Sequence, residues 1–245
     1  MKIGIISASV FPINKHINYG GLEKLVFWHC KAIGELGIDC TLIAPKGSYV
    51  KNATIWETID PPMRWGDEEK LAYEAYRNIL HEFDVLHDHS HHGLPYKSNH
   101  KSIIHTLHGL TTWAQSPTAS PRLVSLSKFH REDTYNKLGH WSEIIGMGID
   151  YESYPYTDKK EDYVLSLGLI APHKNHEFVI DLCSRLNQNL IVCGESNFVP
   201  DPKYVEYIKS KCEKNNFIFK GSINEKEKID LIANAKCVIL PFKIG

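Results

Sequence analysis

The chain has 245 residues, of which 42% are hydrophobic and 23% are charged, as is usual for a folded globular protein. Its net charge of −1 argues against broad attraction to nucleic acid or to an anionic membrane surface. No apolar stretch is long enough for a secretory signal or a membrane span, and the six cysteines lie far apart without a C-x-x-C pair. These features predict a cytoplasmic protein with reduced, buried thiols.

The chain opens with a strand, a loop, a glycine pair and a helix. The apolar run 2–7 predicts a buried parallel strand, and apolar residues recur at helical spacing from Leu22 until Gly37. Between them, Gly20 and Gly21 lie where the carboxyl edge of an open sheet binds ligands. Their amides suit close approach to an anion, although a tight turn that needs positive φ explains the pair equally well.

Strands and helices then alternate along the chain. The first half is expected to form strands at 39–44, 53–58, 84–87, 102–106, 122–126 and 141–145, with one helix capped by Asp67 that runs to His81 and a short helix opened by Ser127. Residues 151–162 are polar and lack periodicity, which predicts a linker. The second half is expected to form strands at 163–168, 190–193, 217–219 and 237–240, and helices at 175–186, 202–214 and 225–235.

The prediction is therefore an α/β fold with two Rossmann-type, doubly wound parallel-sheet domains. Residues 1–150 form the first domain, 151–162 the linker and 163–245 the second domain. The last predicted strand has no helix after it, whereas a parallel sheet needs cover on both faces. We therefore expect the second domain to be incomplete, with a partner or a second copy as candidates to cover its sheet.

Eight short motifs follow one another in a suggestive order. They are Gly20-Gly21-Leu22-Glu23, the run 84–89 (DVLHDH), 105–109 (HTLHG), 125–127 (SLS), 147–150 (MGID), 168–175 (GLIAPHKN), 192–195 (VCGE) and 219–221 (FKG). Together they resemble the retaining, GT-B-fold glycosyltransferases of family four. The resemblance implies transfer of a sugar from a nucleotide-diphosphate sugar to an acceptor. The acceptor would bind the first domain and the donor mainly the second, without a catalytic metal or other cofactor.

The resemblance also implies site residues. Lys174 would neutralise the leaving diphosphate, where fixed positive charge is needed, although a single lysine is by default a solvated surface group. His108 would lie at the reacting sugar, and these two residues are the expected catalytic pair. The donor-binding set is Gly20, Gly21, Lys174, Gly194, Glu195 and Gly221. Glu23 and His89 are expected on the acceptor side of the cleft, and Glu23 has an equally good alternative role within the first turn of its own helix.

A histidine-rich stretch follows the strand at 84–87. His87, His89, His91 and His92 with Asp88 are residue types that bind zinc or a non-haem metal. No H-E-x-x-H or similar signature accompanies them, so we expect a polar wall of the cleft and no metal site. A metal-dependent hydrolase stays open as a distant alternative.

Two departures from the resemblance leave other functions open. Leu169 stands where the family has a second cation at the diphosphate, and the family's E-x7-E segment would begin just after Phe242. One alternative is therefore a non-catalytic or split-enzyme subunit that binds nucleotide sugar with a partner. Another is an isomerase like the nucleotide-sugar 2-epimerases, which share the fold. The acceptor, whether sugar, lipid or small molecule, and association with a membrane stay open, and no nucleic-acid partner is expected.

Overall fold

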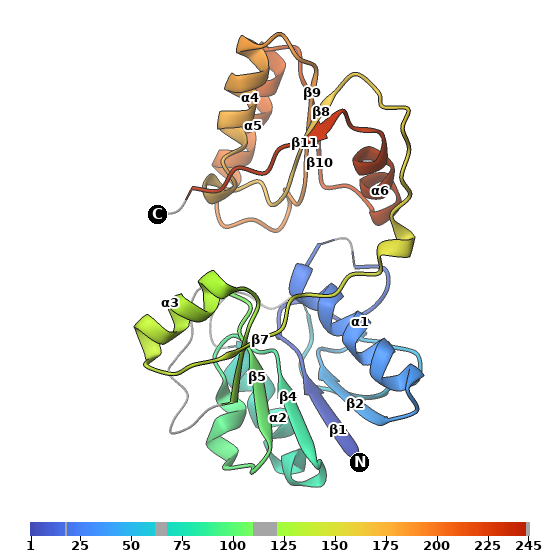
Figure 1. The fold of residues 1–245 in the computed structure, drawn as a ribbon, viewed down its shortest axis with the longest axis vertical. Coiled ribbons are helices and arrows are strands. Elements are labelled where there is room, and N and C mark those ends of the chain that lie inside the picture. The colour runs from blue at the N-terminus through green and yellow to red at the C-terminus, as the bar shows by residue number, and fades with distance from the viewer. Residues whose placement is uncertain (18, 62–67, 110–121, 244–245) are drawn as a thin grey trace. The chain divides into compact units, whose positions relative to one another are not determined.

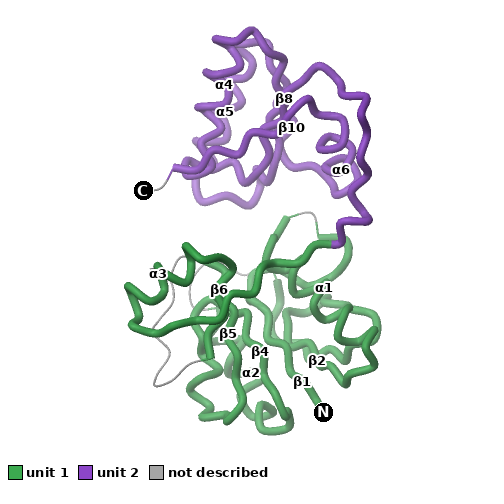
Figure 2. The backbone as a smooth tube through the Cα atoms, in the orientation of Figure 1, with its two compact units in different colours: residues 1–149 green, residues 150–245 purple. Residues whose placement is uncertain are grey.

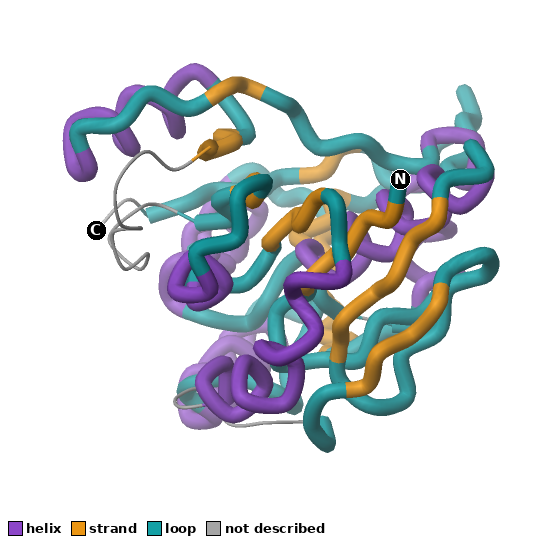
Figure 3. The backbone as a smooth tube through the Cα atoms, turned by 90° about the horizontal axis from the view of Figure 1, so that it is seen from below, coloured by secondary structure: helices purple, strands orange, loops and turns teal. Residues whose placement is uncertain are grey.

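Parallel strands alternate with helices throughout the chain (Figure 1). The computed structural model describes residues 1–17, 19–61, 68–109 and 122–243. The chain divides into two compact units, Met1–Ile149 and Asp150–Gly245 (Figure 2). Helices and strands follow one another along the backbone of both units (Figure 3). The predicted fold class, α/β with two Rossmann-type parallel sheets, is confirmed.

Unit 1 is built on a parallel sheet of seven described strands in the order β3-β2-β1-β4-β5-β6-β7. The strands are β1 Lys2–Ile6, β2 Asp39–Ala44, β3 Thr54–Glu57, β4 Val85–Asp88, β5 Ile103–Thr106, β6 Arg122–Ser125 and β7 Glu143–Ile144. The helices are α1 Gly21–Glu35, α2 Glu68–Tyr76 and α3 Lys128–Leu138, with 3-10 turns at Arg77–Glu82 and Leu94–Ser98. The strand order reverses between β1 and β4, which is where ligands bind in open α/β sheets.

Strand β1 is buried on both faces because successive side chains of a strand point to opposite sides. Ile5 packs in one apolar cluster with Val26 and Cys30 of α1. Ile6 packs in a second cluster with Ala72 of α2 and Leu80 of the following 3-10 turn. The two clusters explain why β1 is a continuous apolar run instead of an alternating one. They hold the carboxyl end of β1 between helices on both sides.

Unit 2 repeats this arrangement with four described strands in the order β10-β9-β8-β11. The strands are β8 Val164–Leu167, β9 Leu190–Cys193, β10 Ile218–Gly221 and β11 Cys237–Val238. The helices are α4 His176–Arg185, α5 Pro202–Lys214 and α6 Glu225–Asn234, with 3-10 turns at Tyr151–Ser153 and Pro172–Lys174. Val179 and Ile208 bring α4 and α5 into one apolar cluster, and Leu231 of α6 packs against a second cluster that contains Leu165.

Several element boundaries differ from the sequence-based prediction. The α-helix expected to reach His81 ends at Tyr76 and continues as a 3-10 turn, in which Phe83 N–H donates to Leu80 O at 3.4 Å before the chain enters β4. The proposed cap Asp67 lies outside the described residues. The expected strand 237–240 is paired over two residues, and Cys237 is exposed because β11 is an edge strand. The other five cysteines are buried free thiols, as expected.

The segment expected as a linker, 151–162, lies within unit 2 and is hydrogen bonded to α6. Lys160 Nζ donates to Ala233 O at 2.6 Å, and Glu161 N–H donates to Asn234 O at 2.8 Å. Both acceptors lie in the last turn of α6, where carbonyls lack partners within the helix. The segment therefore satisfies the end of α6 before the chain enters β8.

Glycine is required where two strand ends of unit 2 meet. Gly194 has φ +147°, and a Cβ on it would lie 1.6 Å from the carbonyl oxygen of Gly168. Its own N–H donates to Gly221 O at 2.9 Å. A side chain at residue 194 would therefore push against the backbone of Gly168. Residue 194 could not easily move away, because its N–H is held by Gly221 O on the other side.

We predict that Gly194→Ala destabilises the protein by about 3 kcal/mol or more, because the clash is with backbone atoms and adds to the positive φ. Urea unfolding followed by circular dichroism measures this. Gly139→Ala is the matched control, since Gly139 has φ +69° with open space around its Cα, and it should cost about 1 kcal/mol. Equal losses in the two variants would contradict the role of the close approach.

Candidate functional site

The carboxyl ends of β4 and β5 bring several histidines together in unit 1. His87 lies on β4 and His89 directly after it, while His108 follows β5. Strand β4 pairs in parallel with both β1 and β5, so their carboxyl ends meet at one edge of the sheet. Helix α1 adds His29 from the side. The edge at which the sequence predicted a ligand site therefore carries four imidazoles.

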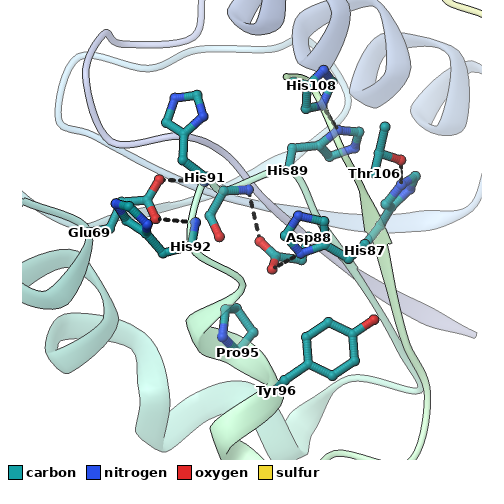
Figure 4. A network of polar contacts seen from close by, with 12 residues as sticks. Glu69, His87, Asp88, His89, His91, His92, Pro95, Tyr96, Thr106 and His108 are labelled. Atoms are coloured by element: carbon teal, nitrogen blue, oxygen red, sulfur yellow. Dashed lines mark hydrogen bonds and ion pairs between the residues drawn. The ribbon is translucent and has the colours of Figure 1, made fainter. Parts of the chain in front are cut away.

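Three of these rings form a hydrogen-bonded chain. His108 Nε2 lies 2.8 Å from His89 Nδ1, and His89 Nε2 lies 3.3 Å from His29 Nδ1. The ring of His87 lies beside that of His89, tilted by 30° with ring centroids 4.1 Å apart, and His87 Nε2 lies 2.7 Å from Thr106 Oγ1 (Figure 4). A neutral imidazole has one N–H and one lone pair, so the proton positions in the chain depend on one another.

Burial keeps these imidazoles uncharged. Burial, with a smaller contribution from neighbouring histidines, lowers the pKa of His87 to about 3 and that of His108 to about 3. Burial also lowers the pKa of His29, and it holds the pKa of His89 well below its usual range. All four rings are therefore neutral near pH 7 and act through hydrogen bonds or lone pairs, not through charge.

A buried contact between Asp88 and His105 lies beside these histidines. Asp88 is fully buried, its Oδ2 lies 2.9 Å from His105 Nδ1, and its Oδ1 accepts from the N–H of Ser90 at 2.9 Å (Figure 4). Burial raises the pKa of Asp88, but the charge and hydrogen bond of His105 outweigh this and hold the pKa below its usual range. Asp88 is thus ionised, and the pair ties β4 to β5.

A second carboxylate holds the turn after β4. Glu69 of α2 accepts from the backbone N–H of His91 at 2.6 Å and of His92 at 2.9 Å (Figure 4). Burial raises the pKa of Glu69, and the two backbone hydrogen bonds act in the opposite direction. His91 and His92 thus lie in the turn, as predicted, and are placed by their backbone.

The glycine loop is closed by its own glutamate. Gly20 has φ +121°, and the carboxylate of Glu23 covers its Cα so closely that a Cβ there would lie 2.4 Å from Glu23 Oε2. Gly21 has open space where a Cβ would stand. Burial raises the pKa of Glu23 to about 7, partly offset by the hydrogen bond with its own backbone N–H. Glu23 thus lies in the first turn of α1, but burial disfavours the charged carboxylate on which the expected role at the helix start depends.

Lys174 lies in a cavity of unit 2. This cavity of about 210 Å³ opens at the ends of β8 and β11 and is lined by Ser166, Gly168, Lys174, His176 and the run 239–242. The Lys174 ammonium lies 4.5 Å from the centre of the Phe242 ring, and burial lowers its pKa. His176 is fixed between Ser166 Oγ at 2.8 Å and Leu169 O at 3.1 Å. Lys174 therefore supplies positive charge to a small, partly apolar cavity.

The other predicted donor-binding residues of unit 2 are Gly194, Glu195 and Gly221, which lie at the carboxyl ends of β9 and β10. Glu195 Oε1 accepts from the N–H groups of Asn197 at 2.6 Å and Phe198 at 2.8 Å. Ser222 Oγ also donates to this oxygen, at 3.1 Å, and so joins the loop after β9 to the loop after β10. Glu195 is thus engaged in shaping its own loop, while Gly194 and Gly221 pair through their backbones.

The structure brings the predicted residues together in two groups, one within each unit. Unit 1 contains His89 and His108 in contact, and Gly20 with Glu23; unit 2 contains Lys174, and Gly194 with Glu195 and Gly221. Sequence reasoning missed His29, Thr106, Ser166, His176 and Ser222. A signal existed for His29, because it adjoins Cys30 and follows Val26 by three residues on the inward face of an apolar helix.

No helix among the described residues is long and apolar enough to cross a membrane.

Comparisons with known proteins agree with this fold. Residues 155–243 match the family model described as glycosyl transferases group 1. A search of curated proteins gives no match. The domain match thus covers most of unit 2 and leaves unit 1 to be compared by structure.

Three solved structures are similar to this chain over nearly its whole length. AviGT4, a glycosyltransferase involved in avilamycin A biosynthesis, is 19% identical over 97% of this chain and 68% of its own, with a TM-score of 0.67. A glycosyltransferase from Rickettsia africae is 15% identical over 98% and 73%, with a TM-score of 0.69. WaaG, a glycosyltransferase involved in lipopolysaccharide biosynthesis, is 14% identical over 98% and 75%, with a TM-score of 0.69. The fold is that of the GT-B glycosyltransferases, and with the domain match it supports a transferase.

We predict that Glu23→Gln stabilises the protein at high pH. The pKa of Glu23 in the folded protein, about 7, lies above the ordinary value of 4.5 for a glutamate, so the folded state binds more protons between these pH values. Stability is therefore lost as the pH rises through this window, and a glutamine removes the loss, by up to about 3 kcal/mol at pH 8 and little at pH 4.

Urea unfolding at pH 4 and pH 8 measures the difference. Glu206→Gln, at an exposed position of α5, is the matched control and should change stability equally at both pH values. If Glu23→Gln behaved in the same way, the Glu23 carboxyl would not be buried in its protonated form.

Proposed function

We propose that this chain is a retaining glycosyltransferase of the family-four type. It would move a sugar from a nucleotide-diphosphate sugar to an acceptor with no requirement for a metal. The observation that carries the proposal is Lys174, placed with its ammonium in the cavity at the end of β8 within the residues that match the glycosyl transferases group 1.

The chemistry requires positive charge where the diphosphate leaves. As the bond between the anomeric carbon and the diphosphate oxygen breaks, negative charge grows on that oxygen and the carbon becomes oxocarbenium-like. The acceptor oxygen then bonds to the anomeric carbon from the same face, and its proton passes to the leaving phosphate. Lys174 would meet the diphosphate as a point charge, because an ammonium is compact and flexible.

The contact of Lys174 with the ring of Phe242 is weak enough for the Lys174 side chain to move when a donor binds. A cation 4.5 Å from a ring centre is held by a weak interaction of about 1 kcal/mol. A diphosphate offers a much stronger partner, so the ammonium can leave the ring when the donor binds. Leu169 stands where the resemblance would place a second cation, and its carbonyl instead fixes His176. Lys174 therefore carries the larger share of the electrostatic role.

In unit 1, His108 would hydrogen bond the reacting sugar. With a pKa of about 3, it would act as a neutral donor or acceptor and not as a charge. His89 would orient His108 through the 2.8 Å contact and line the acceptor side. Gly20 and Gly21 would offer amides to the donor, and Gly21 has the open space that such an approach needs.

We place the protein in the cytoplasm, as the five buried free cysteines support. The acceptor would be a sugar, a lipid or a small molecule.

We predict that Lys174→Ala weakens binding of one nucleoside diphosphate about 10- to 100-fold, as expected for loss of a charge-assisted hydrogen bond. Isothermal titration calorimetry with UDP, GDP and their sugar conjugates measures this. The free nucleosides should bind the variant and the parent equally. Lys209→Ala, at an exposed position of α5, is the control and should leave all affinities unchanged. Loss of nucleoside binding together with the diphosphate would contradict a phosphate role for Lys174.

We also predict that the sugar released or transferred keeps the anomeric configuration of the donor. Proton NMR of the first product formed, in the presence of the donor that binds best, distinguishes the two anomers. An inverted product would refute retention but not transfer. Conversion of the donor into its 2-epimer, with no transfer to any acceptor or to water, would refute the transferase and favour the isomerase.

A further inference from the structure

His29, His87 and His89 bring three potential metal ligands together within unit 1. One ring nitrogen of each histidine lies within 4.8 Å of a ring nitrogen of the other two. Among the described residues, no other group of three or more potential metal ligands is arranged in this way. The ligands come from two elements, because His29 belongs to α1 while His87 and His89 belong to the end of β4. The transfer chemistry proposed above uses none of these nitrogens as a metal ligand.

We propose that His29, His87 and His89 form a binding site for one divalent transition-metal ion, with zinc as the expected occupant. A tetrahedral ion with metal–nitrogen bonds of about 2.0–2.1 Å requires ligand nitrogens about 3.3 Å apart. His29 Nδ1 and His89 Nε2 are 3.3 Å apart. The two rings are within hydrogen-bond distance at this separation, and the same separation matches one edge of the tetrahedron.

The outer nitrogens of two of these histidines already have partners. His89 turns Nε2 toward His29 and Nδ1 toward His108 Nε2, 2.8 Å away. His87 has Nε2 2.7 Å from Thr106 Oγ1, which leaves Nδ1 with a lone pair when Nε2 donates to the hydroxyl. Metal-binding histidines characteristically donate their second N–H to such a partner, which fixes the tautomer and the ring orientation.

The three imidazole ligands favour a borderline-soft dication. A neutral imidazole has one nitrogen that carries a proton and one with a lone pair, so a ring whose second nitrogen donates to a partner has a lone pair for a metal. Three imidazoles and no oxygen ligand suit zinc, cobalt, nickel or copper and do not suit magnesium or calcium.

A bound ion would also set the protonation of His108. With its Nε2 on the metal, His89 would carry its proton on Nδ1, and this N–H would donate a hydrogen bond to His108 Nε2. His108 must then keep its own proton on Nδ1, so it presents a donor and not an acceptor. This consequence concerns the sugar-binding role proposed above, whereas metal binding itself does not depend on that function.

The test is equilibrium binding of zinc chloride and cobalt chloride to the full chain after removal of metals with a chelator. We expect one equivalent of tightly bound metal. His29→Gln, His87→Gln and His89→Gln should each weaken binding by more than about 100-fold, and His108→Gln by 10- to 100-fold as a change in the outer shell. His81→Gln, at an exposed position, is the matched control and should bind as the parent does.

Two further measurements separate loss of the site from loss of the fold. Thermal unfolding in the presence of chelator shows whether each variant is folded without metal. Nitrogen-15 NMR of the imidazoles in the parent chain needs no variant, and saturating zinc should shift the ring signals of these three histidines and not that of His81. Metal binding with unchanged affinity in all three glutamine variants, or imidazole shifts confined to other histidines, would overturn the proposal. So would the absence of tight binding to the parent.

Discussion

The parallel pairing of β4 with β1 and β5 is the constraint on which the candidate site depends. It places Asp88 opposite Ile6 on one side and His105 on the other. A fully buried carboxylate is costly unless it is paired, and the 2.9 Å contact with His105 supplies a partner from the neighbouring strand. The pair therefore joins two strands at the edge where His89 and His108 emerge, and the loops beyond it start from a rigid base.

The two units contribute different electrostatics. In unit 1 burial keeps the imidazoles uncharged, so they interact with their surroundings through hydrogen bonds or lone pairs and not through charge. In unit 2 the ammonium of Lys174 faces a small cavity and the ring of Phe242. Such a division suits a reaction in which one partner is a neutral hydroxyl group and the other carries a diphosphate. In the proposals above, the metal ion would bind to unit 1 and the anionic diphosphate would bind to unit 2.

Packing requires glycine at some of the predicted site positions and not at others. Gly194 is required by the approach of Gly168, whether or not a ligand binds, because any side chain would enter the neighbouring backbone. Gly21 has no neighbour where its Cβ would stand, so packing does not demand glycine there. Of the four glycines predicted to bind the donor, Gly21 is thus the one whose identity packing leaves unexplained.

The sequence by itself determined the α/β class, the two sheets and nearly every strand and helix, because the periods of strands and helices connect residues that are close in the chain. It also indicated His89, His108 and Lys174 through short motifs at strand ends. Only the tertiary structure showed that Glu23 is buried, that Glu195 is occupied by its own loop, and that His29 joins the histidines. The contact of His29 with His89 links residues 60 positions apart, and no local pattern encodes such a contact. It arises when α1 packs on β1 and the sheet aligns the ends of its strands.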